Sequence, residues 1–247
     1  MKTKVWVLIL LSASSVFAQT ESLPSSLVPV DPARQPGLGL SVPARQLLIP
    51  SRAVKEIERA QAAFASGDIH SSAGHLEKAL RIYPACLEAH NALGSRYISL
   101  REYEKAAAEF QRAIDIDPRV LPPVSNLSVA LFLLGRYPQA EAAARRALEL
   151  DSSNKTARYM LGAILATEGR NPMEAANLLR QTRSDFSDAR LLLAKIWSSA
   201  GNLEEAKTEL REYLKSPDPA KKQNVERWLA RLSQAPGTDR AQERQAP

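Results

Sequence analysis

The sequence predicts an all-α fold, an array of stacked helical hairpins, and two observations support this prediction. The first is a period. Glycine recurs at Gly67, Gly135, Gly169 and Gly201, and Arg101 stands where the missing member of the series falls, so the intervals are 34, 34, 34 and 32 residues. A unit of about 34 residues is typical of two-helix repeats, which cannot bury their apolar faces alone and must stack on neighbouring repeats.

The second observation is a residue pattern that recurs at the same period. In the clearest unit the pattern runs through Leu93-Gly94, Tyr97, Tyr103, Ala106, Phe110, Ala113 and Pro118. A shift of 34 residues brings into register Leu127-Ser128, Leu131, Gly135, Tyr137, Ala140, Ala144 and Ala147. Small residues at these places allow two helices to approach to about 8 to 10 Å where they cross.

These spacings resemble the tetratricopeptide repeat, whose pattern is a Leu-Gly pair, aromatic residues, alanines and a closing proline. The resemblance covers residues 51–232. It implies antiparallel helix pairs stacked into a right-handed superhelical solenoid with a concave inner face. It does not imply a particular function, because the pattern residues are packing residues.

The array is expected to span residues 51–219 and to hold about five units, followed by a capping helix over residues 220–234. The expected units are 53–86, 87–120, 121–154, 155–186 and 187–219. The fourth unit is irregular because its pattern slips by one residue at Asn171-Pro172. In the last segment, Val225, Trp228, Leu229 and Leu232 recur at helical spacing among charged residues, as expected of a helix that covers the last hairpin.

The two ends of the chain differ from the repeats. Lys2 and Lys4 precede an apolar run, and Val16-Phe17-Ala18 follows it, which indicates a signal peptide over residues 1–18. The apolar run is shorter than the roughly 20 residues of a membrane-spanning helix, so we expect no stable membrane insertion. Residues 19–50 are rich in proline and serine and are expected to form a linker. Residues 235–247 are expected to be a disordered tail.

Charge and cysteine content narrow the class of protein. The formal net charge of +6 falls to +4 without Lys2 and Lys4, and no block of five basic residues occurs, so nucleic acid is not an expected partner. Cys86 is the only cysteine, so the fold depends on core burial without a disulfide. Together with the signal peptide, this predicts an exported protein, periplasmic or secreted, of bacterial type.

The resemblance also indicates where a partner would bind, because in this family the first helix of each hairpin lines the concave groove. Asn91 and Ser125 are candidates to hydrogen-bond an extended peptide, and Phe132 and Tyr159 are candidates for apolar pockets. The alternative is that these side chains only fill a narrow groove. The full set of candidate groove residues is Asn91, Ser95, Ser125, Phe132, Tyr159 and Lys195.

The sequence gives little support for a carboxylate-binding, metal-binding or catalytic site. The cations that chaperone-binding members of the family use to hold a C-terminal carboxylate are absent from the corresponding places. His70 and His75 lack the four-residue spacing of a helical metal pair, and no histidine is placed by sequence to activate Cys86, which we expect to be a buried filler. His90 is expected to be an ordinary surface or groove residue. The registration places Glu104, Glu109 and Asp115 on solvated helix faces.

The sequence thus predicts a non-catalytic scaffold, with no cofactor and no metal, that binds a protein or peptide in its concave groove. The alternative is a structural assembly component that oligomerises or docks through its edge or its proline-rich N-terminal arm. An enzyme of the cell envelope is a more distant possibility.

Overall fold

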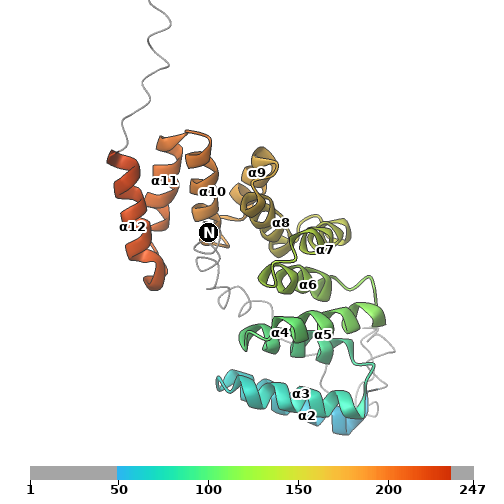
Figure 1. The fold of residues 1–247 in the computed structure, drawn as a ribbon. Helices are drawn as coiled ribbons and strands as arrows, with labels where there is room; N and C mark the ends of the chain where they lie inside the picture. Colours follow the sequence, from blue (N-terminus) through green and yellow to red (C-terminus); the bar gives the residue numbers. More distant parts are fainter. Residues whose placement is uncertain (1–48, 235–247) are drawn as a thin grey trace, which may run out of the picture. The chain divides into compact units, whose positions relative to one another are not determined.

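Residues 49–234 are the part of the chain that the structure, a computed structural model, describes. Eleven helices and no strand occur among these residues, which confirms the all-α prediction for this part of the chain. The predicted signal peptide and tail, and nearly all of the predicted linker, lie outside the described residues. The helices are α2 (Ser51–Ala65), α3 (Ile69–Ile82), α4 (Leu87–Ser99), α5 (Tyr103–Ile116), α6 (Leu121–Leu133), α7 (Tyr137–Leu150), α8 (Lys155–Glu168), α9 (Pro172–Thr182), α10 (Asp188–Ser199), α11 (Leu203–Tyr213) and α12 (Pro219–Gln234) (Figure 1).

The described residues fall into two compact units, which we call the N-terminal unit (49–164) and the C-terminal unit (165–234). In the N-terminal unit, α2 packs on α3, α4 on α5 and α6 on α7, and α3 and α5 also contact the first helix of the next hairpin. In the C-terminal unit, α9 contacts α10, α10 pairs with α11, and α11 contacts α12. The sequence therefore forms helical hairpins followed by a capping helix.

The glycines that recur in the sequence lie in turns that share the same backbone geometry. Gly67, at the end of the first hairpin's first helix, has a φ of 83°, and the amide of Asp68 then donates to the carbonyl of Ala63 at 2.9 Å. A residue in the left-handed conformation turns the chain so that the amides after it donate hydrogen bonds to the last carbonyl groups of the helix. Arg101 adopts the same conformation without being glycine, at a φ of 61°, and Glu102 donates to Tyr97 at 2.8 Å.

The irregular fourth unit carries a second left-handed residue that is not glycine. Asn171, at the position of the sequence slip, has a φ of 45° and directly precedes α9, whose first residue is Pro172. Asparagine tolerates this region better than most residues because its short polar side chain bonds locally. The extra residue in the turn is thus absorbed before α9 begins.

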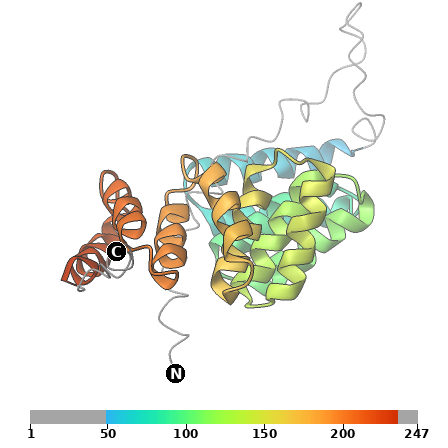
Figure 2. The same cartoon turned by 90° about the horizontal axis from the view of Figure 1, so that it is seen from above.

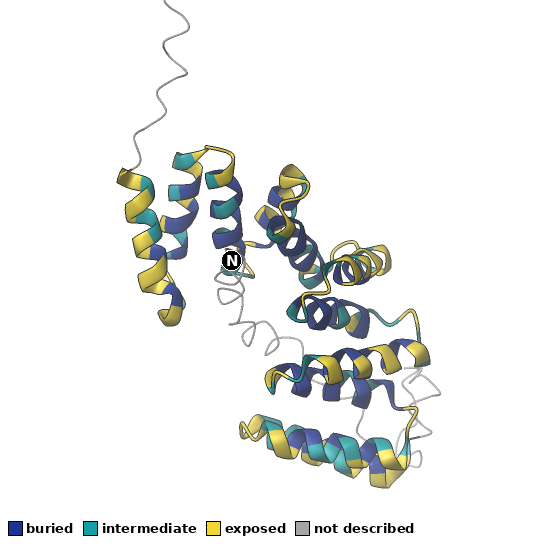
Figure 3. Cartoon of the chain, viewed as in Figure 1, coloured by how far each residue is buried: buried dark blue, intermediate teal, exposed yellow. Residues whose placement is uncertain are grey.

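Small pattern residues form the contacts within each hairpin. Ala106 of α5 and Ala140 of α7 have no exposed surface. Figure 3 shows the buried parts of these helices in dark blue. Gly94 of α4 faces the ring of Phe110 so closely that a Cβ atom on residue 94 would lie 2.6 Å from Cε1 of that ring. A residue larger than glycine cannot enter here unless the buried ring moves.

The helix α12 covers α11 in the C-terminal unit, and the two lie side by side in both views (Figure 2). Val225 is buried and Trp228 is half-buried, whereas Lys222 and Glu226 are exposed. Lys221 is also buried, and its Nζ lies 2.6 Å from Oδ2 of Asp188 at the start of α10. An apolar inner side and a charged outer side are the properties of a capping helix.

Candidate partner-binding face of the first helices

The residues predicted to line a groove all lie on the first helices of hairpins, and within each unit we call the side of these helices that carries them the first-helix face of that unit. Five of them belong to the N-terminal unit and one, Lys195 on α10, belongs to the C-terminal unit. The five are Asn91 and Ser95 on α4, Ser125 and Phe132 on α6, and Tyr159 on α8. The contacts of each residue are given below within its own unit.

An amide pair joins two successive first helices. The Nδ2 group of Asn126 on α6 donates to Oδ1 of Asn91 on α4 at 3.0 Å. Asn126 is buried and Asn91 is half-buried. A side-chain amide group can donate two hydrogen bonds from its nitrogen, so an amide at this place suits the peptide groups of an extended segment.

The two predicted serines bond to their own helices. Ser95 donates from Oγ to the carbonyl of Asn91, and Ser125 donates to the carbonyl of Pro122, each at 3.1 Å. Only 2% of Ser95 and 4% of Ser125 is exposed. Their hydroxyl donors are therefore used inside the helix, as is common for serine within helices.

The two predicted aromatic residues are packed rather than open. Phe132 and Tyr159 are both buried. The centroid of the Phe132 ring lies 5.5 Å from that of Tyr137 at an interplanar angle of 54°, a tilted arrangement that is favourable for aromatic pairs. The rings of Phe132 and Tyr159 therefore both belong to the packed interior of the N-terminal unit.

In the C-terminal unit, Lys195 and Ser198 share one side of α10, because they are three residues apart. The Nζ of Lys195 donates to the carbonyl of Ala166 in the last turn of α8 at 3.2 Å, where a cation is favourable, and burial lowers the pKa of this amine. Ser198 has the only buried side-chain polar atom without a hydrogen-bond partner between residues 49 and 234. A buried hydroxyl in that state is a place where a partner atom or a water would bond.

A buried ionic cluster between α4 and α5 was not foreseen from the sequence. His90 places Nδ1 2.6 Å from Oε2 of Glu109 and Nε2 2.9 Å from the carbonyl oxygen of Pro84. Arg112 pairs with the other carboxylate oxygen of Glu109. Only 7% of either His90 or Glu109 is exposed.

The prediction that Glu109 lies on a solvated face is therefore wrong, and so is the placement of His90 on the surface or in the groove. Glu109 is three residues after Ala106 and four before Ala113, and both of these alanines are fully buried. Residues at these spacings lie on one side of a helix, so Glu109 faces α4. The same spacing could have identified it from the sequence. Glu104 and Asp115 are exposed, as predicted.

Charged residues also recur in other hairpins at the positions equivalent to His90 and Glu109. One hundred residues later, Arg190 of α10 bonds Oε2 of Glu209 of α11 at 3.0 Å, and Arg183 bonds its other oxygen at 2.7 Å. Thirty-four residues earlier the charges are exchanged, because Glu56 of α2 lies 2.7 Å from Nδ1 of His75 of α3. In the hairpin α6/α7 the equivalent residues are Val124 and Ala143.

The remaining reactive groups do not assemble a site. Cys86 is buried, and burial, with a contribution from Glu88, raises the pKa of its thiol to about 11, so the nucleophilic thiolate is scarce at neutral pH. His70 is exposed.

The described part of the chain holds no cluster of three or more His, Cys, Asp or Glu residues that could bind a metal ion. None of its helices combines the length and the apolar character needed to cross a membrane.

Sequence comparison identifies the repeats directly. Residues 57–120 and 126–172 match the family model of the tetratricopeptide repeat. No curated protein sequence matches the chain significantly. The match covers both first-helix positions of the Asn91–Asn126 pair and the hairpin that holds His90 and Glu109.

Solved structures share the fold at low sequence identity. PilW, described as a widely conserved type IV pilus biogenesis factor, is 21% identical with a TM-score of 0.65, over 74% of this chain and 87% of PilW. TTC0263, a tetratricopeptide repeat protein of Thermus thermophilus, is 21% identical with a TM-score of 0.55, over 73% and 98%. YrrB, described as having an unusual peptide-binding site, is 21% identical with a TM-score of 0.55, over 71% and 92%. These likenesses show the tetratricopeptide-repeat fold.

Proposed function

We propose that this chain, which carries tetratricopeptide repeats over residues 57–120 and 126–172, is a non-catalytic scaffold that binds a peptide or a partner protein on its first-helix face. Proteins with this repeat generally mediate interactions between proteins. The family match and the helical hairpins support the general class, and the placement of the binding surface is our proposal.

The observation that carries the placement is the Asn91–Asn126 pair, which brings amide groups of successive hairpins together on the first-helix face. An extended peptide presents alternating amide and carbonyl groups, and side-chain amides can bond to both. The half-buried Asn91 is within reach of such a segment, whereas Ser95 and Ser125 serve their own helices.

The charge of the lining further restricts the partner. The helix α6 has no ionisable residue along its whole length, Leu121–Leu133. On its neighbour α4, the predicted lining positions hold Asn91 and the buried Ile98. We therefore expect recognition in the N-terminal unit by amide hydrogen bonds and apolar contact rather than by ion pairs. This expectation agrees with the absence of a carboxylate-binding set of cations in the sequence.

We also propose that the protein is exported and acts in the periplasm or outside the cell, with an array of five units over residues 53–219. The support for export is the segment Lys2–Ala18, which has the order of charges, apolar residues and small residues of a signal peptide. Amino-terminal sequencing of the protein from its native envelope fraction tests this. A mature chain that begins at Gln19 supports export, and a cytoplasmic chain that retains Met1 contradicts it.

The alternative is a structural assembly component, and the end helices limit how such an assembly would form. On α2, Lys55, Glu58 and Arg59 are exposed, and on α12 Lys222 and Arg227 are exposed. Charged outer sides do not favour stacking of one copy onto the end of another. An assembly would therefore use an edge of the hairpins or the N-terminal arm.

Site-specific photo-crosslinking in the full chain distinguishes these functions. A photoreactive amino acid at Asn91 or Lys195 probes the first-helix face of each unit. The same amino acid at the exposed Glu104 of α5 or Glu204 of α11 serves as a control on the second helices. Circular dichroism verifies that each variant is folded.

Crosslinks to another protein from position 91, absent from position 104, support the proposed function. Crosslinks to the same partner mainly from positions 104 and 204 contradict the placement on the first-helix face. Crosslinks between two copies of the chain from any of the four positions favour the assembly component.

A further inference from the structure

The ring of His90 contacts an oxygen atom with each of its nitrogens. Nδ1 faces the carboxylate of Glu109 at 2.6 Å, and Nε2 faces the backbone carbonyl of Pro84 at 2.9 Å. Pro84 lies in the connection between α3 and α4, and Glu109 lies on α5. One side chain thus ties α4 both to its hairpin partner and to the turn before it.

These two contacts specify the protonation of the ring. A carbonyl oxygen only accepts hydrogen bonds, so Nε2 must carry a hydrogen to bond Pro84. The carboxylate of Glu109 also accepts, and its other oxygen pairs with the guanidinium of Arg112. Both contacts are hydrogen bonds only when the ring is the doubly protonated imidazolium. When the ring loses one proton, whichever nitrogen is left bare faces an oxygen lone pair.

We propose that His90 is a proton-dependent clamp, which holds α4 to α5 and to the α3–α4 connection when protonated and releases one of these contacts when it loses a proton. The folded hairpin offers one acceptor to each N–H group of the imidazolium. Loss of a proton removes one of these two hydrogen bonds, so the hairpin α4/α5 is held by fewer contacts when the ring is neutral.

The charged groups around the ring are compatible with this direction. The charged group that contacts the ring is Glu109, whose second partner is Arg112. The helix α6, which also packs near α4, contributes no ionisable side chain. Other ionisable groups on these elements have their own contacts. They include Glu77 of α3, bonded to the hydroxyl of Tyr97; His75 of α3, paired with Glu56; Cys86 and Glu88, paired with each other; Arg96, stacked on Phe64; Lys105, paired with Glu102 and over the ring of Tyr97; and Asp115, bonded to Gln111.

The other hairpins provide variants of the same positions. In α10/α11 the residue equivalent to His90 is Arg190, which keeps its charge at every physiological pH and pairs with Glu209. In α6/α7 the equivalent pair is Val124 and Ala143, which does not titrate. In α2/α3 the pair Glu56–His75 is more exposed, with 25% of the histidine side chain accessible, so solvent screens the contact.

The experiment compares three full-length proteins between about pH 5.5 and pH 8.5, a range that spans the ordinary titration of histidine. The first is the wild type. The second is His90→Arg, which copies the pair of α10/α11, and the third is the double variant His90→Val/Glu109→Ala, which copies the apolar pair of α6/α7. Thermal unfolding is followed by circular dichroism, and His90 ring nitrogens are observed by nitrogen-15 NMR.

We expect the melting temperature of the wild type to fall with rising pH by roughly 2 to 4 °C more than that of the double variant, in which the clamp is absent. His75 and His70 are common to all three proteins, so their contribution cancels. Near pH 6 both ring nitrogens of His90 should show protonated resonances. A folded wild type in which one ring nitrogen is bare at that pH, or equal pH dependence in wild type and double variant, overturns the proposal.

The inference concerns the stability of a hairpin and holds whether or not the first-helix face binds a partner. If the proposed function is also correct, the clamp has a consequence for it. Asn91 directly follows His90 on α4 and bonds to α6. A partner bound at Asn91 should then dissociate faster at alkaline pH from the wild type than from His90→Arg, whereas the melting experiment is decided independently of any partner.

Discussion

The second and third hairpins, α4/α5 and α6/α7, have the same length and the same turn geometry, but different chemistry between their helices. Between α4 and α5 lie a buried hydrogen-bonded pair, His90–Glu109, and a glycine that faces a phenylalanine ring. The equivalent places between α6 and α7 hold Val124 opposite Ala143, and Ser128 opposite Ala144. The turn of the second hairpin has Arg101 where the third has Gly135, and both have a positive φ.

The difference shows that the repeat specifies positions and leaves the chemistry of each contact open, provided that the two helices compensate each other. A large residue on α5 is matched by the smallest residue on α4, and a carboxylate is matched by an imidazole. Such compensation follows from close packing and from the cost of an unpaired buried charge. The hairpin α10/α11 obeys the same rule with Ala194 opposite Leu210, and with Arg190 opposite Glu209.

The largest effect should come from breaking the charge compensation of the second hairpin. Glu109→Ala leaves the buried His90 without its carboxylate, and removal of one partner from a buried pair costs about 3 kcal/mol. The matched control is Glu104→Ala on the same helix, an exposed position where substitutions usually change stability by less than about 0.5 kcal/mol. Urea unfolding at pH 6 measures both. Equal unfolding midpoints for the two variants would show that the pair contributes no stability.

The next effect concerns steric compensation in the same hairpin. Gly94→Ala puts a methyl group 2.6 Å from the buried ring of Phe110 and should lower the free energy of unfolding by about 1 to 3 kcal/mol. In the third hairpin Ser128→Ala adds no volume and removes one hydrogen bond to the carbonyl of Ser125, at a cost of about 1 kcal/mol. The same unfolding experiment ranks them. A Gly94→Ala protein as stable as wild type would mean that the two helices separate without cost.

The third hairpin offers its own overpacking test. Ala140 of α7 is fully buried, so Ala140→Phe should destabilise the protein by about 1 to 3 kcal/mol. Ala142, two residues later, is exposed, and Ala142→Phe serves as the control. Melting curves of the two variants should differ by several degrees. A melting temperature unchanged by Ala140→Phe would contradict the packing of α6 on α7.

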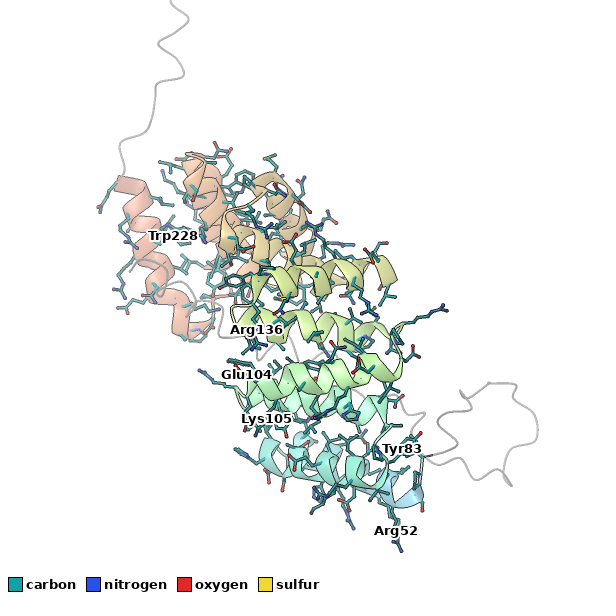
Figure 4. All side chains as sticks on the ribbon, turned by 45° about the vertical axis from the view of Figure 1, so that its right-hand side comes forward. Arg52, Tyr83, Glu104, Lys105, Arg136 and Trp228 are labelled. Carbon is teal, nitrogen blue, oxygen red and sulfur yellow. The ribbon has the colours of Figure 1, made fainter. Side chains whose placement is uncertain are left out.

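The smallest effect comes from the two turns. Arg101 adopts a left-handed conformation that costs an ordinary residue about 1 to 2 kcal/mol, so Arg101→Gly should raise the stability by about 0.5 to 1 kcal/mol, since glycine also adds freedom to the unfolded chain. Gly135→Arg should do the reverse in the third hairpin. The backbone is the cause, because Arg101 is exposed, and the nearby Glu104, Lys105 and Arg136 project from an exposed edge of the unit (Figure 4). Opposite signs in the melting shifts test this account.

The turns and helix crossings of these hairpins were predictable because they depend on residues that recur at a fixed period. Glycines that recur every 34 residues give the turns, and alanines at fixed spacing give the helix crossings. The first-helix residues Asn91, Ser125 and Phe132 could also be assigned to their helices from this register. Their burial and bonds could not, because whether Ser125 bonds its own helix or a partner depends on side-chain geometry that a repeat pattern does not encode.

The His90–Glu109 pair was missed for a related physical reason. A charged residue in a repeat is usually solvated, which favours an outward position for Glu109, although its spacing from Ala106 and Ala113 places it on the side of α5 that faces α4. Its compensation by His90 lies 19 residues away on the other helix, so neither residue alone reveals the pair. Comparison with Arg190 and Glu209 at the equivalent positions would have revealed it, because a charge then appears on both helices of two hairpins.

The most direct test of compensation between the two helices is a double-mutant cycle at positions 90 and 109. The unfolding free energies of wild type, His90→Val, Glu109→Ala and the double variant are measured at pH 6. We predict a coupling energy above about 1.5 kcal/mol, with the double variant more stable than Glu109→Ala because it recreates the apolar pair of α6/α7. Additivity within about 0.5 kcal/mol would contradict the account.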